Sequence, residues 1–343
     1  METKIGFDNE KYFNAQTNAI IKRCSKFSKL YLEIGGKLLF DGHASRVLPG
    51  YDGRNKIKLL KQLKNEIEVL YCINSKELEK GKTWSDTKLT LDKLAIKETK
   101  ELKKNGIKVL GIVATRFCGQ KKVIKLKQEL KKEKINLFYT KEIKGYPNNL
   151  KLVFGKNGFD CQDRINTTRK IIVVTGAGAG SGKMFACMSQ IYQDDKLKVN
   201  SGYAKWETFP IWNLPLNHPV NIAYEAATAD LGDKNMLDLR HKKAYGIPSV
   251  NYNRDIENFD LLKKIINEFV PKENYMHSYK SPTDMGINHA KEGIINDSIV
   301  QTASKQEILR RFYFFSERVK QRASKKDTMK RLNELLKKAN IKL

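Results

Sequence analysis

The sequence predicts an α/β protein with a Rossmann-like, mostly parallel sheet and helices on both faces, followed by a smaller helical region. Short runs rich in Ile, Val and Tyr alternate with amphipathic helical patterns as far as Thr175. A glycine-rich loop then follows a buried run and opens a helix. The final quarter has mainly helical periodicity. We therefore expect an α/β domain over residues 1–255 and a helical region over residues 256–343.

The expected strands are short runs of β-branched and aromatic residues, which pack well on a half-buried pleated surface. They are Leu30–Ile34, Ile67–Ile73, Ile107–Ala114, Ile135–Tyr139 and Ile171–Thr175. Apolar residues at helical spacing predict connecting helices near Lys56–Asn65, Leu89–Asn105 and Lys121–Glu133. This alternation makes the strands parallel and places any ligand beyond their carboxyl ends.

The second half of the chain begins with a stretch that has no clear period. Residues 195–255 combine Gly, Pro and Asn with several aromatics, which predicts one long, ordered and packed loop. Helices are expected after it at Glu257–Phe269, Ser304–Arg322 and Lys326–Ala339. Because the connection around Ser324–Lys325 is short, the last two should pair as an antiparallel hairpin that packs their apolar stripes together.

The glycine-rich loop carries the strongest functional signal. Its candidate phosphate-binding residues are Gly176, Gly178, Gly180, Ser181, Gly182 and Lys183. They follow a buried strand, so backbone N–H groups and a helix N-terminus can face an anion. The nucleotide P-loop pattern would have Gly at Ala177 and a hydroxyl at Met184, and the dinucleotide fingerprint would have Gly at Ser181. Two interpretations stay open: a phosphate-binding loop, or only a tight strand-to-helix turn.

A second glycine turn, Gly35-Gly36-Lys37, also follows an expected strand. Taken alone, it is a simple turn. Two Gly-Lys turns after strands of one parallel sheet can nonetheless converge on one crevice.

Polar residues among aromatics and prolines are the candidate acid–base groups. His218, Glu225, Asp230 and Asp284 lie between residues 203 and 286, where buried polar groups form hydrogen bonds or shift their pKa values. These four are candidates for proton transfer or ligand orientation. The alternative is that they cap local turns and helices. The sequence contains neither H-E-x-x-H nor G-x-S-x-G, so it lacks zinc-metalloprotease and serine-hydrolase signatures, and no metal site is expected.

Charge and cysteine content bear on partners and location. The 343 residues include 65 Lys and Arg against 38 Asp and Glu, a net charge of +27. This excess falls on the polar faces of expected helices without interleaved aromatics, so nucleic acid is not the expected partner. Five scattered cysteines without a C-x-x-C pair fit a reducing, cytoplasmic compartment. No apolar run reaches the length of a membrane span.

Ordered motifs run through the whole chain. They are the loop Gly176–Lys183, Trp212-Asn213-Leu214-Pro215-Leu216, His218-Pro219-Val220-Asn221, Ala223–Leu231, Asn251–Asp255 and Ser281–Gly286. Together they resemble a bacterial family catalogued only as a domain of unknown function. Some of its members are labelled ATP-dependent peptidases, a name that the motif searches above do not support. The resemblance implies longer members with a further α/β domain after the helical region, and Pro where Ala177 and Ala179 stand.

These observations predict that a nucleotide or phosphorylated metabolite binds at residues 176–183. They identify neither the ligand nor a reaction, and they leave open whether the protein is an enzyme. The alternative is a non-catalytic scaffold whose glycine loop is only a turn. Because a further domain would pack on the helical region, we also expect exposed apolar area on the C-terminal helices and self-association through them.

Overall fold

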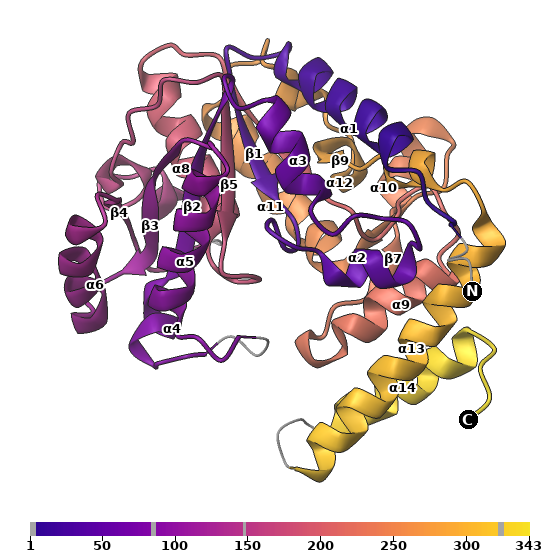
Figure 1. Cartoon of the computed structure of the whole chain (residues 1–343). Helices are drawn as coiled ribbons and strands as arrows, with labels where there is room; N and C mark the ends of the chain where they lie inside the picture. Colours follow the sequence, from indigo (N-terminus) through magenta and orange to yellow (C-terminus); the bar gives the residue numbers. More distant parts are fainter. Residues whose placement is uncertain (1–4, 84–86, 147–148, 322–325) are drawn as a thin grey trace.

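The structure, a computed structural model, describes residues 5–83, 87–146, 149–321 and 326–343 (Figure 1). A seven-stranded sheet lies at its centre in the order β4-β3-β2-β5-β1-β6-β9, with parallel pairing throughout. Helices surround the sheet, so the α/β class is confirmed. A separate antiparallel pair joins β7 to β8. Because β5 pairs directly with β1, the turns that leave these two strands start side by side.

Predicted and observed elements agree closely in the first half, where the five expected strands correspond to β1 through β5 and the three expected helices to α3, α5 and α6. The strands are β1 (Lys29–Ile34), β2 (Ile67–Asn74), β3 (Val109–Phe117), β4 (Asn136–Lys141), β5 (Ile171–Gly176), β6 (Ser201–Trp206), β7 (Asn235–Leu237), β8 (Val250–Tyr252) and β9 (Gly286–Ile287). The helices of the described residues are α1 (Asn9–Cys24), α2 (Gly42–Val47), α3 (Asn55–Gln62), α4 (Ser75–Glu79), α5 (Leu91–Lys104), α6 (Lys121–Lys132), α7 (Leu150–Val153), α8 (Lys183–Lys196), α9 (Pro219–Ala227), α10 (Leu239–Tyr245), α11 (Asn253–Phe269), α12 (Pro282–Met285), α13 (Asp297–Lys320) and α14 (Lys326–Lys338). Short 3-10 helices are η1 (Phe159–Cys161), η2 (Ala229–Leu231), η3 (Tyr275–Ser278) and η4 (Ala290–Gly293).

The prediction of one long loop over residues 195–255 is wrong, because this stretch contains β6, α9, β7, α10 and β8. Strand β6 has no clear apolar run, yet all six of its residues are buried. Gly202 leaves room for the Phe27 ring, whose nearest atom would lie 2.2 Å from a Cβ at this position. Lys205 is buried with carboxylate partners supplied by the fold. Tertiary contacts therefore stabilise a strand that the residue pattern alone does not reveal.

The two faces of the sheet contribute to two apolar clusters. Tyr71 and Ile73 of β2 pack with α5 and α6. Their neighbours Leu70 and Cys72 belong to the largest cluster, which includes residues of α8 and α11. Because successive strand residues point to opposite faces, β2 is buried along its whole length.

Helices α13 and α14 form a hairpin that projects from the sheet (Figure 1). The apolar stripe of α14, which includes Leu332, Leu335 and Leu336, is buried in a cluster with residues of α13 and α9. The predicted hairpin is therefore confirmed, although its connection around Ser324–Lys325 lies outside the described residues. Tyr313 and Phe314 of α13 are exposed, and self-association through this region stays a prediction.

The predicted division at residue 255 also stays a prediction. Strand β9 pairs with β6 in the central sheet, and α11 contributes to the largest apolar cluster. The early part of the expected helical region therefore helps to build the sheet half of the molecule.

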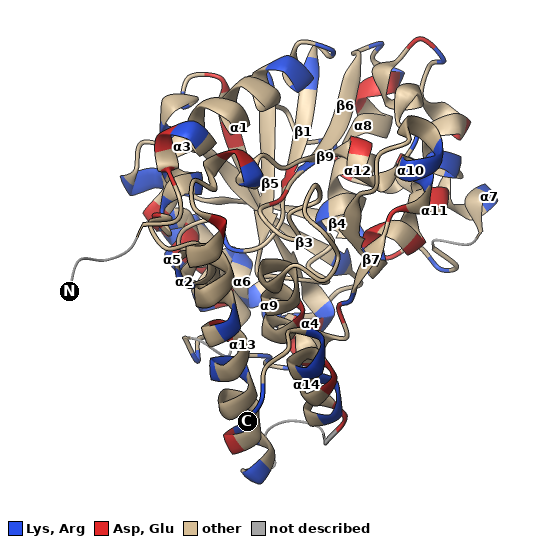
Figure 2. Ribbon diagram, turned by 90° about the vertical axis from the view of Figure 1, so that its right-hand side faces the viewer, with Lys and Arg blue, Asp and Glu red and all other residues tan. Residues whose placement is uncertain are grey.

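Charged residues are distributed over many elements. Figure 2 shows Lys and Arg on helices throughout the view, interspersed with Asp and Glu. The expectation that nucleic acid is not a partner stays a prediction. None of the described helices is both long enough and apolar enough to cross a membrane.

Candidate functional site

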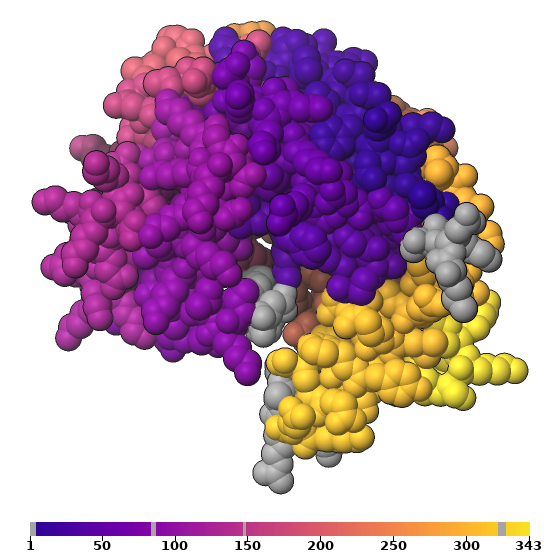
Figure 3. Space-filling model, in the orientation of Figure 1, coloured from indigo at the N-terminus to yellow at the C-terminus, as the bar shows by residue number. Residues whose placement is uncertain are grey.

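Two glycine turns converge at the carboxyl ends of neighbouring strands. The loop after β5 and the turn Gly35–Lys37 after β1 line one cavity of about 470 Å³. The two turns thus share a crevice, which their positions after strands of one parallel sheet make possible. On the face shown in Figure 3, the molecule is hollowed between the sheet half and the hairpin of α13 and α14.

The carbonyl groups of the loop after β5 are held by neighbouring strands. The Asn74 side chain donates a hydrogen bond to the Gly180 carbonyl at 3.0 Å, and the Thr115 hydroxyl donates one to the Ser181 carbonyl at 2.8 Å. Gly182 has a φ of +84°, and a Cβ there would lie 2.6 Å from Thr115 Oγ1. The loop is thus fixed in a left-handed turn that requires glycine at this position.

The N–H groups in the second part of the same loop lack partners among the described residues. Those of residues 179 to 183 donate no hydrogen bond to any residue that the structure describes. Gly182 is the N-cap of α8, so these donors lie at the positive end of a helix dipole. The Ser181 hydroxyl is buried and has no partner among the described residues. Lys183 Nζ lies 3.3 Å from the Gly178 carbonyl oxygen and 3.8 Å from Glu33 Oε1.

A lysine shared by two carboxylates lies at the end of β6, beside the glycine loop. We call it the Lys205 cluster: Lys205, Glu207, Asp255 and Tyr252. Lys205 Nζ lies 2.8 Å from Glu207 Oε1 and 2.6 Å from Asp255 Oδ2. Burial alone would lower the pKa of Lys205, but these two carboxylates raise it well above its ordinary value. Burial raises the pKa of Glu207 to about 7, since the pull of Lys205 is countered by the charge of Asp255.

A second cavity of about 450 Å³ adjoins the first. Both are lined by the Gly35-Gly36 turn, Glu207 and Tyr224. Lys56 lies beneath the turn with 1 % of its side chain exposed, and it donates a hydrogen bond to the Gly35 carbonyl at 2.7 Å. Burial lowers the pKa of Lys56, although Asp41, 3.6 Å away, acts in the opposite direction.

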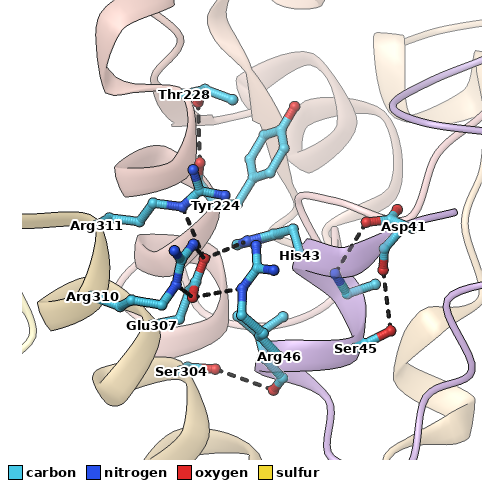
Figure 4. A network of polar contacts seen from close by, with 12 residues as sticks. Asp41, His43, Ser45, Arg46, Tyr224, Thr228, Ser304, Glu307, Arg310 and Arg311 are labelled. Carbon is cyan, nitrogen blue, oxygen red and sulfur yellow. Dashed lines mark hydrogen bonds and ion pairs between the residues drawn. The ribbon is translucent and has the colours of Figure 1, made fainter. Parts of the chain in front are cut away.

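The far wall of the second cavity is basic. We call its ion-paired group the Glu307 cluster: Glu307, Arg46, Arg310, Arg311 and His43 (Figure 4). Burial alone would raise the pKa of Glu307, but hydrogen bonds from Arg310, His43 and Arg46 hold it well below its ordinary value. Burial lowers the pKa of His43 despite its contact with Glu307.

None of the four predicted acid–base residues lines either cavity. His218 caps α9 by accepting a hydrogen bond from the Val220 N–H at 3.2 Å, and its Nε2 lies 2.9 Å from Asp297. Asp284 completes the capping box of α12. The structure does not bring these two side chains to the glycine loop.

The other two predicted residues also lie apart from the cavities. Glu225 accepts a hydrogen bond from the Asn235 N–H at 3.2 Å and lies 3.5 Å from Arg331. Asp230 is exposed in η2. Hydrogen bonds and ion pairs within the fold therefore account for three of the four residues, and Asp230 is exposed. The catalytic roles of all four residues stay predictions.

Sequence reasoning identified Lys183 but missed several other charged residues that line the cavities. Lys205 and Glu207 are two positions apart with opposite charge, which places them on one side of an extended strand. That spacing is the signal that could have identified them. Arg310 and Arg311 follow Glu307 at ordinary helical spacing and resemble a surface ion pair. Arg46 joins them only through the fold, so no local pattern reveals it.

Within the described residues, no three His, Cys, Asp or Glu side chains gather where they could hold a metal ion. The glycine loop and residues of the two charged clusters line the two adjoining cavities. Their N–H, ammonium and guanidinium donors suit an anion.

Comparison with known proteins places the chain among bacterial relatives. The family described as "Domain of unknown function DUF1846, N-terminal" matches residues 5–340. A UPF0371 protein of Clostridium tetani (strain Massachusetts / E88) is 43% identical over 339 residues, which is 99% of this chain and 67% of the relative. A UPF0371 protein of Clostridium botulinum (strain Alaska E43 / Type E3) is 44% identical over the same lengths. The relatives are longer than the matched region, as the resemblance of the motifs implies.

Proposed function

We propose, from the premise that this chain belongs to the DUF1846 family, that it binds a small phosphate-bearing molecule at the glycine loop. The ligand class is a nucleotide or a phosphorylated metabolite. The observation that carries the proposal is the set of N–H groups at residues 179 to 183, which donate to no described residue and belong to a loop that lines a cavity.

Three features of the loop favour a phosphate over a neutral ligand. The unpaired backbone donors lie on consecutive residues, so one ligand with several acceptor oxygens can accept from more than one of them. The N-terminus of α8 adds a positive dipole end. Lys183 places an ammonium group beside the loop, 3.8 Å from Glu33 Oε1. Met184 lacks the hydroxyl that holds Mg²⁺ in a P-loop, so nucleotide hydrolysis is not part of this proposal.

Glu207 is the candidate proton-transfer group of the same cavity. A group with a pKa of about 7 is present in both protonation states near neutral pH, which suits it to accept or donate a proton. Lys205 is a positioning residue, because its ammonium lies 2.8 Å from Glu207 Oε1 and is itself paired with Asp255. Glu207 is a further candidate beside the four acid–base residues predicted from the sequence, and the proposal specifies no reaction.

Thermal-shift measurements on the full chain test phosphate binding. We would compare ATP, NAD⁺, ribose 5-phosphate and inorganic phosphate with adenosine and ribose at constant ionic strength. At a concentration of 100 times its Kd, a ligand of the native state raises the free energy of unfolding by about 2.7 kcal/mol. We expect at least one phosphate-bearing compound to do so, and the phosphate-free compounds to have no such effect.

Two lysine variants make the test specific for the loop. Lys183→Ala should abolish the shift. Lys196→Ala is the matched control, because Lys196 lies at the other end of α8 and pairs with Asp160 on the surface. Equal responses to phosphate-bearing and phosphate-free compounds would contradict the proposal and favour the scaffold alternative, in which the loop is only a turn.

A further inference from the structure

The Glu307 cluster contains more positive charge than its carboxylate can neutralise. Arg46 Nε lies 2.8 Å from Oε2 of Glu307, Arg310 Nε lies 2.6 Å from the same oxygen, and Arg311 Nε lies 2.9 Å from Oε1 (Figure 4). Three guanidinium groups thus share one carboxylate. Because arginine stays protonated in proteins, the group has two positive charges in excess.

Most guanidinium donors of this cluster remain available. Each guanidinium carries five N–H donors. Toward residues that the structure describes, Arg46 and Arg311 each donate through Nε alone, and Arg310 donates through Nε and Nη2. The Glu307 side chain is 1 % exposed and both its oxygens already accept from arginines, so it has little capacity for more. The remaining N–H groups need acceptors from solvent or from a ligand.

The cluster is held in place by separate parts of the fold. Arg46 comes from α2, and Arg310 and Arg311 come from α13. The Glu307 carboxylate connects the two helices by pairing with arginines of both. Arg311 is only 17 % exposed. Like charges held this close repel one another, and partial burial removes the water that would screen them. An anion on the cavity side would relieve that repulsion.

The remaining charges of the second cavity do not cancel this excess. Asp41 faces Lys56 at 3.6 Å, which forms a balanced pair at the back of the cavity. Glu207 faces Lys205 in the Lys205 cluster. His43 contributes no charge near neutral pH, because burial lowers its pKa. The three arginines therefore supply a positive excess to this cavity, which Lys37 also lines.

We propose that Arg46, Arg310 and Arg311 form a second oxyanion site, which binds the other end of the molecule held at the glycine loop. The inference rests on the proposed function and specifies its ligand class: a small molecule with a phosphate at one end and a phosphate or carboxylate at the other. The two cavities share the Gly35-Gly36 turn, Tyr224 and Thr228, so one ligand can extend from loop to arginines. Glu207 lines both cavities and thus lies beside the middle of such a ligand.

Calorimetric titration of the full chain with alkane bisphosphonates of increasing length tests this ligand class. Methylphosphonate is the one-ended reference. Because linking two groups that bind adjacent sites converts the second contact into an intramolecular one, the best-fitting bisphosphonate should bind at least about tenfold more tightly than methylphosphonate. The matching ω-phosphonocarboxylates identify the second group: an equal gain indicates that the arginines accept a carboxylate, and a smaller gain indicates a preference for phosphate.

Arginine variants assign the gain to the second site. Arg46→Gln with Arg310→Gln should remove the gain and leave methylphosphonate binding unchanged, whereas Lys183→Ala should weaken both. The matched control is Arg240→Gln, which removes a partly exposed arginine of α10 that pairs with Asp260 of α11. If the double variant does not fold, the single variant Arg310→Gln replaces it, because the Arg310 side chain is 45 % exposed. This variant should reduce the affinity gain of the bisphosphonate over methylphosphonate at least about threefold.

Two results would overturn the inference, and they differ in what they leave standing. If methylphosphonate binds through Lys183 but no bisphosphonate gains affinity, the second site is wrong and the proposed function stands. If methylphosphonate binding depends on Arg46 and Arg310 but not on Lys183, the proposed function fails and the two-ended ligand fails with it.

Discussion

The two charged clusters beside the cavities are built in opposite proportions. In the Lys205 cluster, one ammonium is shared by the carboxylates of Glu207 and Asp255. In the Glu307 cluster, one carboxylate is shared by three guanidinium groups. A proton can relieve the surplus negative charge of the first, because a carboxylate can be protonated near neutral pH. It cannot relieve the surplus positive charge of the second, because arginine does not release its proton.

The comparison teaches how one site can separate two tasks. A surplus of carboxylate produces a group that exchanges protons, as the raised pKa of Glu207 indicates. A surplus of guanidinium produces a group that attracts anions and keeps its charge at every physiological pH. Variants of the Lys205 cluster should therefore respond to pH, and variants of the Glu307 cluster should respond to added anions.

The largest effect is expected from removing the shared ammonium. Lys205→Met leaves Glu207 and Asp255 largely buried without a counter-ion, and breaking a buried ion pair in this way costs about 3–5 kcal/mol. Urea unfolding at pH 8 measures this loss. The double variant Lys205→Met with Glu207→Gln should recover part of it, because one of the unpaired charges is gone. A loss of unfolding free energy below about 1 kcal/mol would show that the Lys205 cluster is solvated. The proposed difference between the Lys205 and Glu307 clusters would then be wrong.

A smaller effect is expected from removing the shared carboxylate. Glu307→Gln leaves three guanidinium groups together, but Arg46 and Arg310 are 40 % and 45 % exposed and can be hydrated. We expect a loss of about 1–3 kcal/mol in chloride. Sulfate or phosphate at equal ionic strength should restore part of it. The control is Lys205→Met, which these anions should not rescue; equal rescue of both variants would indicate a general salt effect.

The pH dependence of stability should have opposite signs in the two clusters. The folded state raises the pKa of Glu207 from 4.5 to about 7, so it keeps a proton that the unfolded chain releases, and the contribution of Glu207 to stability falls as pH rises across that window. The folded state lowers the pKa of Glu307, so its contribution is present above pH 4.5 and is lost as pH falls below it.

Each slope can be assigned with one substitution. Glu207→Gln should flatten the stability profile between pH 4.5 and 7, and Glu307→Gln should flatten it below pH 4.5. Unfolding free energies from urea titrations over this range give the profiles. If Glu207→Gln leaves the slope above pH 4.5 unchanged, Glu207 is ionised throughout and is not the proton-exchanging group.

The smallest effect is expected at an exposed ion pair of the same helix α13. Glu317 and Lys320 lie 2.8 Å apart with side chains 61 % and 69 % exposed. Glu317→Gln should change the free energy of unfolding by less than about 0.5 kcal/mol, because water and salt screen such pairs. A change as large as that of Glu307→Gln would mean that the charge ratio of the Glu307 cluster has no special importance.

The sequence predicts the elements that depend on neighbouring residues, and it does not reveal those that depend on residues far apart in the chain. Strands β1 through β5 follow from apolar runs, and the hairpin of α13 and α14 follows from helical stripes, because each depends on local periodicity. The glycine loop is likewise local, since its residues are consecutive. Strand β6 is hidden because Lys205 looks like a surface residue until Asp255 is placed beside it. The Glu307 cluster is hidden because Arg46 and Glu307 are far apart in the chain.

The predicted acid–base residues show the same limit. His218 and Asp284 are set among aromatics and prolines, which is the pattern of a functional group, yet in the fold they cap helices. Capping satisfies a buried polar group as well as a ligand does, so residue type and surroundings cannot separate the two roles.

The most direct test of the contrast is a measurement of the two carboxyl pKa values in one protein. Selective ¹³C labelling of glutamate allows the side-chain carboxyl signals to be followed by NMR during a pH titration, and Glu207→Gln and Glu307→Gln assign the two signals by their disappearance. We predict that Glu207 titrates near pH 7 and that Glu307 stays ionised well below pH 4.5. Titration of both groups near pH 4.5, or of Glu307 at a higher pH than Glu207, would contradict the account.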